Sequence, residues 1–171
     1  LKFNAAPGFP AGDLTMEGNF ASYIDRLLMP GKLYLDIHDP EGLASTIPAI
    51  STGLLGIMTG TFIKSDPSSG TSKSIKMAAV GLLFLGLAFL WNFSFPINKN
   101  LWSSSFVLYV AGLDCMFFAF LYYLVDMLGY TKWAKFAIVF GSNAIAAYLA
   151  SEIFYDLIYY KVGGVEGTSL N

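Results

Sequence analysis

The sequence predicts an all-α fold: a polytopic membrane helix bundle with about four transmembrane helices and an N-terminal extracytoplasmic segment. Three observations support this class. The 171 residues are 55% hydrophobic. Only 13% are charged, about half the charge of a typical soluble domain. Four stretches, each of a length that can cross a bilayer, carry few or no charges, at residues 43–63, 77–95, 101–125 and 136–160.

Residues 1–42 are expected to lie outside the lipid, in a loop that contains one amphipathic helix. Asn19 can cap this helix, whose apolar residues recur at helical spacing on one face. Asp25 and Arg26 are expected to point away from that face. The apolar positions are Phe20, Tyr23, Ile24, Leu27 and Leu28. The helix is too short to span, so it should lie at the interface or pack on the bundle.

The first expected span begins at Asp39-Pro-Glu-Gly42, where Asp39 can cap the helix and Pro40 suits its first position. Residues 43–63 follow without a charge and would measure about 31 Å at 1.5 Å per residue. Small residues at Thr52, Gly56 and Gly60 form a stripe that favours close helix packing in lipid.

The remaining chain alternates polar connections with apolar spans. A loop is expected at 64–76, a turn at 96–100 and a second loop at 126–135. Asp114 is the only charge in the span at 101–125. The last span, 136–160, is expected to run as one helix, followed by a flexible tail at 161–171.

The lysines of the short connections predict the orientation. Lys64, Lys73 and Lys76 lie in the first loop and Lys132 and Lys135 in the last, whereas the 96–100 turn has a single lysine. Positive residues favour the cytoplasmic side. The N-terminal segment and the 96–100 turn are therefore expected on the extracytoplasmic side.

Polar groups suited to acyl transfer are expected to gather there. Such a reaction needs a base for the nucleophile and donors for the developing oxyanion. The candidates are His38, Asp39, Glu41, Asn98, Lys99 and Asn100, with Trp102 beside them. The alternative interpretation is structural: Asp39 and Glu41 would cap the first span, and Asn98 or Asn100 the third. No metal site is predicted, because the single histidine and its acidic neighbours lack the usual ligand spacing.

Asp114 and Asn143 are expected at similar depth inside the bilayer. A carboxylate in a membrane helix is costly and usually faces the bundle interior or a water cavity. If the third and fourth spans are antiparallel neighbours, Asp114 would approach Ser142-Asn143. This pair would be structural, or it would contact a cofactor or substrate.

Several short motifs, in order, resemble the heparan-α-glucosaminide N-acetyltransferase family, especially the C-terminal part of its bacterial relatives. They run from Tyr23-Ile-Asp-Arg-Leu-Leu28 and Asp39-Pro-Glu-Gly-Leu43 through Pro96-Ile-Asn-Lys-Asn-Leu-Trp102 to Gly141-Ser-Asn-Ala-Ile145. Together they cover most of residues 20–150.

The resemblance implies an integral protein of the bacterial inner membrane. Such enzymes transfer acetyl from cytoplasmic acetyl-CoA to an amino sugar or glycan on the far side of the membrane. It also implies that the family's catalytic histidine lies in an N-terminal half outside these residues, so no catalytic residue is assigned here. The chain alone is therefore expected to be an inactive fragment. The expected partners are the lipid bilayer, the glycan acceptor and that N-terminal half, with homo-oligomerisation left open.

The main rival is a membrane module without enzymatic activity, either a carrier or a scaffold. A transporter would show helices broken near the middle of the membrane. Nucleic acid is not an expected partner, because a net charge of −2 provides no attraction for phosphate backbones.

Overall fold

The computed structural model describes residues 5–29, 31, 33, 34 and 36–161. Within these residues the chain is helical, and its only β features are two isolated bridges, between Ala5 and Asn19 and between Leu33 and Asp36. The predicted all-α class is therefore confirmed. The chain divides into two compact units, residues 1–127 and 128–171. The expected tail lies outside the described residues, apart from the end of the last helix.

The first unit opens with helix α1, Phe20–Leu28. Asn19 caps it as predicted: its side-chain Oδ1 accepts a hydrogen bond from the Ser22 amide at 2.7 Å. The side of α1 that is buried is the polar one. Ser22 and Asp25 are buried, whereas Leu27 and Leu28 are about 60% exposed. The polar face therefore packs on the protein, which leaves the apolar face free for the membrane interface.

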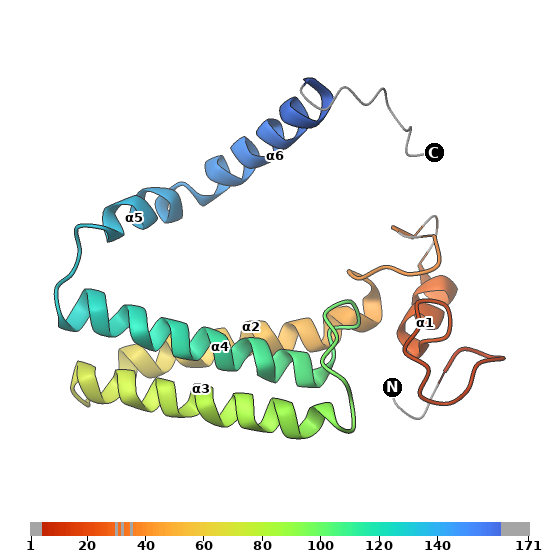
Figure 1. Ribbon diagram of the computed structural model, residues 1–171, viewed down its shortest axis with the longest axis horizontal. Helices are drawn as coiled ribbons and strands as arrows, with labels where there is room; N and C mark the ends of the chain where they lie inside the picture. Colours follow the sequence, from red (N-terminus) through yellow and green to blue (C-terminus); the bar gives the residue numbers. More distant parts are fainter. Residues whose placement is uncertain (1–4, 30, 32, 35, 162–171) are drawn as a thin grey trace. The chain divides into compact units, whose positions relative to one another are not determined.

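Three long helices follow: α2 at Leu43–Ser65, α3 at Gly70–Asn92 and α4 at Ser104–Tyr122. A π-helical turn, Tyr123–Met127, extends α4. All three are long and apolar enough to cross a membrane. Figure 1 shows that the start of α2 and the α3–α4 connection lie at the same end as α1, with the α2–α3 connection at the other.

Close backbone contact holds α3 against α4. Gly81 and Gly112 face each other so tightly that a methyl group on either would meet backbone atoms of the other helix within 3.0 Å. Farther along, the Ser74 hydroxyl donates to the carbonyl oxygen of Ala119 at 2.8 Å. Ala88 and Ala119 are almost fully buried between the helices. Small residues thus let the two backbones approach, as is typical of helix pairs in lipid.

Two helix starts differ from their expected positions. The expected loop 64–76 is helical from Gly70, because Ser69 caps α3 there. The two lysines in the first turns of α3 have partners outside the helix: Lys73 donates to the Ile63 carbonyl and Lys76 to the Asp66 carboxylate. The third span begins at Ser104, since Leu101 and Trp102 belong to the preceding turn.

The second unit contains a broken helix where one continuous helix was predicted. Helix α5 spans Ala134–Ser142 and α6 spans Ala144–Lys161, and their axes are bent by 87°. Asn143 has non-helical backbone angles, and its side-chain amide donates to the Val139 carbonyl at 2.9 Å. An asparagine that bonds local backbone competes with the helix. The pair counts as a fourth span only if both helices are taken together.

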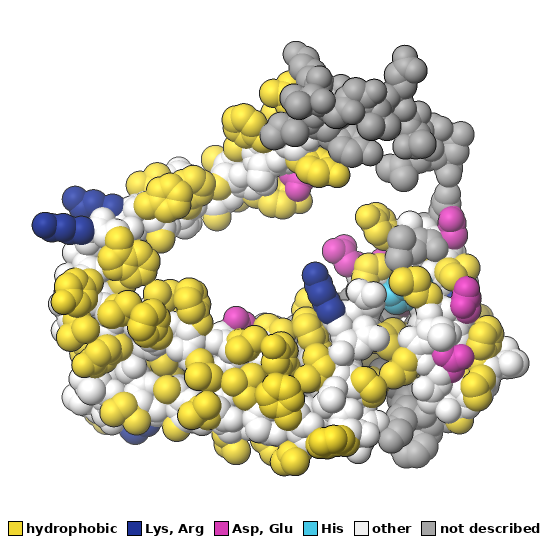
Figure 2. Space-filling model, viewed as in Figure 1, with side chains coloured by type: hydrophobic (Ala, Val, Ile, Leu, Met, Phe, Trp, Pro, Cys, Tyr) yellow, Lys and Arg dark blue, Asp and Glu magenta, His cyan; other side chains and the backbone are white. Residues whose placement is uncertain are grey.

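Hydrophobic side chains cover most of the helical surface that Figure 2 shows, whereas acidic side chains gather around the N-terminal region. The helices of the first unit expose large residues such as Ile57, Leu82, Leu90 and Phe117. Such a surface suits lipid or protein neighbours rather than water.

Candidate functional site

His38 is buried at the α1 end of the first unit, in a short polar network. Its Nδ1 lies 2.6 Å from the Ser22 hydroxyl oxygen. That oxygen also accepts a hydrogen bond from the Asn19 side-chain amide at 2.8 Å. All three side chains are at most 2% exposed. The network joins the first turn of α1 to the segment that precedes α2.

The network has a defined direction. The Asn19 amide can only donate to Ser22, so the Ser22 hydroxyl proton is free to point at His38 Nδ1. The neutral imidazole then carries its proton on Nε2. This Nε2 atom is buried and has no hydrogen-bond partner among the described residues.

Burial lowers the pKa of His38 below its usual value, because the protonated ring loses solvation. The carboxylates of Asp25 and Asp39 act in the opposite direction, and Arg26 adds a smaller lowering effect. The neutral form is therefore favoured near pH 7. A buried histidine whose Nδ1 is occupied cannot take a proton from an external amine.

Asp25 connects α1 to the start of α2. Its Oδ1 accepts hydrogen bonds from the amides of Leu43 at 2.8 Å and Ala44 at 3.4 Å. Gly42 occupies the N-cap position without a side-chain cap of its own, and the Asp25 carboxylate lies where a Gly42 side chain would be. A buried carboxylate from another helix therefore satisfies the α2 N-terminus and complements its dipole.

Asp39 and Glu41 do not cap α2, contrary to the structural alternative. The Asp39 Oδ1 accepts from the Glu41 amide at 2.9 Å, which forms a local turn before the helix. Asp39 is half-buried, and the Glu41 side chain is exposed. Pro40 also precedes α2, which starts at Leu43.

The 96–102 turn is closed by side-chain bonds of its own. The Asn98 Oδ1 accepts from the amides of Asn100 at 2.9 Å and Leu101 at 3.3 Å. Ser103, rather than either asparagine, caps α4. Lys99 and Asn100 are exposed at the tip of the turn.

Two contacts hold this turn against the rest of the unit. The Trp102 indole Nε1 donates to the Thr52 hydroxyl of α2 at 3.2 Å. Leu101 is buried and lines a small cavity together with Asn19, Phe20 and other residues around the start of α1. The turn, the His38 network and the start of α2 therefore share one end of the unit (Figure 1).

Asp114 and Asn143 belong to different units. Asp114 lines a groove of about 310 Å³ between α2 and α4, with Gly56, Gly60 and Cys115. Asn143 forms the break between α5 and α6. Their pairing stays a prediction.

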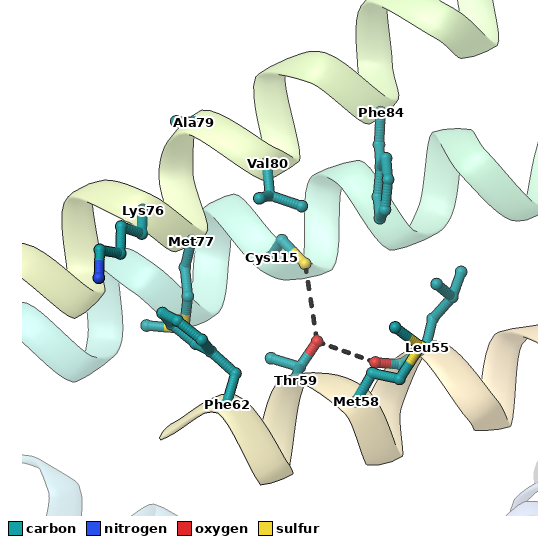
Figure 3. Close-up of a pocket in the computed structure, with 10 residues that line it drawn as sticks. All are labelled: Leu55, Met58, Thr59, Phe62, Lys76, Met77, Ala79, Val80, Phe84 and Cys115. Carbon is teal, nitrogen blue, oxygen red and sulfur yellow. Dashed lines mark hydrogen bonds between the residues drawn. The ribbon is translucent and has the colours of Figure 1, made fainter. Parts of the chain in front are cut away.

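A second groove, of about 510 Å³, lies among α2, α3 and α4. Figure 3 shows Lys76 at one end of its lining and Phe84 at the other. Thr59 and Cys115 face each other across it, with 4.0 Å between Oγ1 and Sγ. Its lining is otherwise apolar.

Sequence reasoning missed the roles of Ser22 and Asp25. Asp25 lies in the matched motif Tyr23-Ile-Asp-Arg, but the sequence predicts only that Asp25 and Arg26 point away from the apolar face, with no partner for either. The Arg26 guanidinium donates to the carbonyl oxygens of Ile37 at 2.6 Å and Glu17 at 2.7 Å. The signal available in the sequence was the adjacent pair of opposite charges, Asp25 and Arg26, in a short and otherwise mostly apolar helix. Such a pair can indicate that both side chains bind other parts of the protein.

Among curated proteins, the chain is similar to the heparan-alpha-glucosaminide N-acetyltransferases of Homo sapiens and Mus musculus. The human protein is 31% identical over 91% of this chain, and the mouse protein 32% identical over 88%. The chain spans 28% and 27% of their respective lengths. No family model and no solved structure matches. The resemblance that the motifs indicated is thus confirmed: the chain is related in sequence to part of these acetyltransferases.

Proposed function

We propose that residues 1–171 form part of an integral membrane acetyltransferase, which transfers acetyl from acetyl-CoA to an amino sugar or glycan across the membrane. The observation that carries this proposal is the 31% identity to the human enzyme over 91% of the chain. Three helices able to span a bilayer agree with a membrane enzyme.

In the proposed reaction, the acceptor nitrogen attacks the thioester carbonyl carbon. A C–N bond forms, the C–S bond breaks, and the amine proton leaves with the thiol of coenzyme A. This chain supplies no assigned base, because His38 is buried and its Nδ1 is engaged with Ser22. The family's catalytic histidine is expected outside these residues.

The distribution of lysines supports an orientation with the α2–α3 connection in the cytoplasm. Lys76 then lies on the donor side. The 510 Å³ groove beside it has an apolar lining that suits the acetyl and alkyl parts of the donor. The Lys76 ammonium, which is paired with Asp66 here, would bind a donor phosphate in exchange for that carboxylate. Acetyl-CoA would enter the bundle at this end.

The acceptor would meet the opposite end, where Asp39, Glu41, Asn98, Lys99 and Asn100 lie. Asp39 and Glu41 could bind the amino group of the acceptor, and Lys99 could bind anionic groups of the glycan. Trp102 offers an apolar ring near the same turn. These residues would line the acceptor site rather than perform the proton transfer.

Vesicles that contain the native polypeptide would test the function. Labelled acetyl-CoA is enclosed on the cytoplasmic side, glucosamine is supplied on the other side, and labelled N-acetylglucosamine is measured. We expect transfer of label across the membrane. Failure to acetylate glucosamine or a glucosamine-terminated glycan, with intact protein, would reject the proposal.

Glu41→Gln and Lys99→Gln would then test the acceptor site. We expect KM for the acceptor to rise and KM for acetyl-CoA to stay unchanged. Glu17→Gln is the matched control, because Glu17 is an exposed acid of the same N-terminal segment. Equal effects of all three substitutions would show that the acceptor site lies elsewhere.

A carrier remains the second candidate, because one observation favours it. The 87° bend at Asn143 resembles the discontinuous helices that form substrate sites in transporters. Exchange of unmodified substrate across the vesicle membrane, without acetylation, would favour the carrier.

A further inference from the structure

Asp114 is a carboxylate in the middle of a membrane-spanning helix. It lies ten residues after Ser104, the first residue of α4, or roughly 15 Å along the helix axis. Its side chain is exposed on the first unit, and it makes no hydrogen bond or ion pair with the part of the chain that the structure describes. Carboxylates at this depth are costly unless they face protein or a water-filled cavity.

The surface beside Asp114 is shaped for the close approach of another helix. Asp114 lines the 310 Å³ groove, whose opposite wall includes Gly56 and Gly60 of α2. A methyl group added at either glycine would meet no other atom within 4 Å. No residue in the most apolar 18-residue stretch of α2 is buried. The α2 wall of the groove is therefore open at the two glycines, and the groove carries one anionic group.

The described helices that are long enough to span carry no basic residue near their middle. The basic residues of α2 and α3 are Lys64, in the last turn, and Lys73 and Lys76, near the start, whereas α4 has no basic residue. In α5 and α6 the basic residues are Lys135 and Lys161, at the outer ends. A second copy of this chain would therefore bring no mid-span cation to Asp114.

We propose that this groove is the docking site for a further transmembrane helix of the same polypeptide, from outside residues 1–171, with a lysine or arginine near mid-span. Charge complementarity selects the cation, and the open glycine wall allows the helix backbone to approach. The aligned region is only 28% of the human relative, so most of such a protein lies outside this chain. The inference rests on that relationship and not on acetyl transfer.

Photocrosslinking of the native polypeptide in membranes would test the proposal. Benzoylphenylalanine is placed at Phe118, which lines the groove, and at Phe117 as the matched control. Phe117 is the same residue type on the same helix and is more exposed, 65% against 43%. We expect position 118 to capture an apolar peptide segment that contains a lysine or arginine from outside residues 1–171. Position 117 should give several-fold less of this product.

Charge reversal supplies the second readout. Asp114→Lys should lower capture at position 118 several-fold, and changing the captured cation to aspartate in that background should restore it. If Asp114→Lys does not fold, Asp114→Asn provides the comparison, and it should reduce capture because the ion pair is lost. Capture of lipid alone, of a second copy of residues 1–171, or of a segment without a cation would overturn the proposal. Unchanged capture in a folded Asp114 variant would also overturn it.

Discussion

Ser22 Oγ lies 2.6 Å from Nδ1 of His38, and both side chains are buried. The pair joins the first turn of α1 to the segment before α2. It differs from a nucleophile–base pair in one respect: Ser22 is fully buried and has no access to a substrate. Its role is to hold two segments together, and its strength depends on which form of His38 is present.

Acid should weaken the first unit through His38. Burial lowers the pKa of His38 in the folded protein, so the unfolded chain binds the proton more readily. Stability is then complete above the unfolded pKa, about 6.5, and falls as the pH drops below it towards the folded pKa. Thermal unfolding of the purified protein between pH 7.5 and 5 would measure this loss. The free energy of unfolding should fall by about 1.4 kcal/mol for each pKa unit between the unfolded and folded values.

His38→Gln should remove this part of the pH dependence, because glutamine does not titrate. Ser22→Ala is the matched control: it removes the hydrogen bond but keeps the titrating imidazole. It should lower stability at every pH and retain the acid loss. An unchanged pH profile in His38→Gln would assign the acid effect to another group.

The carboxylate of Asp25 should stabilise α2 in two ways, as a hydrogen-bond acceptor and as a negative charge at the helix N-terminus. Asp25→Ala leaves the Leu43 amide without its partner, and loss of a cap costs about 0.5–2 kcal/mol. Asp25→Asn keeps an acceptor oxygen and loses only the charge, worth about 0.3–1 kcal/mol at a helix N-terminus. Denaturation should therefore rank the wild type above Asp25→Asn, and Asp25→Asn above Asp25→Ala. Equal stability of the two variants would show that the charge, not the hydrogen bond, matters.

The membrane helices could be predicted from the sequence because their signal is local. Long uncharged stretches identify spans whatever their neighbours are, and Asn19 could be recognised as a cap because it precedes an amphipathic run. Caps supplied from a distance could not be recognised in this way. Asp25 caps a helix that begins 18 residues later. Nothing in residues 39–43 indicates that Asp39 bonds a local turn instead of capping this helix.

The break at Asn143 was missed for a related reason. Residues 136–151 are uncharged and contain no proline, so hydropathy predicted one continuous helix. Gly141, Ser142 and Asn143 are three successive poor helix formers, and this was the signal available. Packing against neighbouring helices can compensate for such a weak helix preference. A single sequence does not show those neighbours, so it does not show whether the helix breaks.

The hydrogen bond between Trp102 and Thr52 should couple the 96–102 turn to α2. Trp102→Phe removes the indole donor, and Thr52→Val removes the hydroxyl acceptor at nearly constant volume. In a double-mutant cycle we expect a coupling energy of about 0.6 kcal/mol, and at most about 1.7 kcal/mol, the range measured for hydrogen bonds between membrane helices. Unfolding in mild detergent would provide the four stabilities. Strict additivity would mean that the 3.2 Å contact contributes no net energy.

Gly81 and Gly112 should tolerate no side chain, because they lie where α3 and α4 touch. Gly86, which is also in α3, should accept alanine. A methyl group at Gly81 would lie 2.8 Å from the Gly112 carbonyl oxygen, and one at Gly112 would lie 2.9 Å from the Gly81 carbonyl oxygen. Because backbone atoms cannot move aside, α3 and α4 would have to separate, at a cost of about 1–3 kcal/mol for overpacking.

At Gly86 the added methyl group meets nothing within 4 Å, and the higher helix propensity of alanine should stabilise the protein by up to about 1 kcal/mol. Unfolding midpoints of the three alanine variants would check this order, and a stable Gly81→Ala protein would mean that α3 and α4 pack less closely than their glycines indicate.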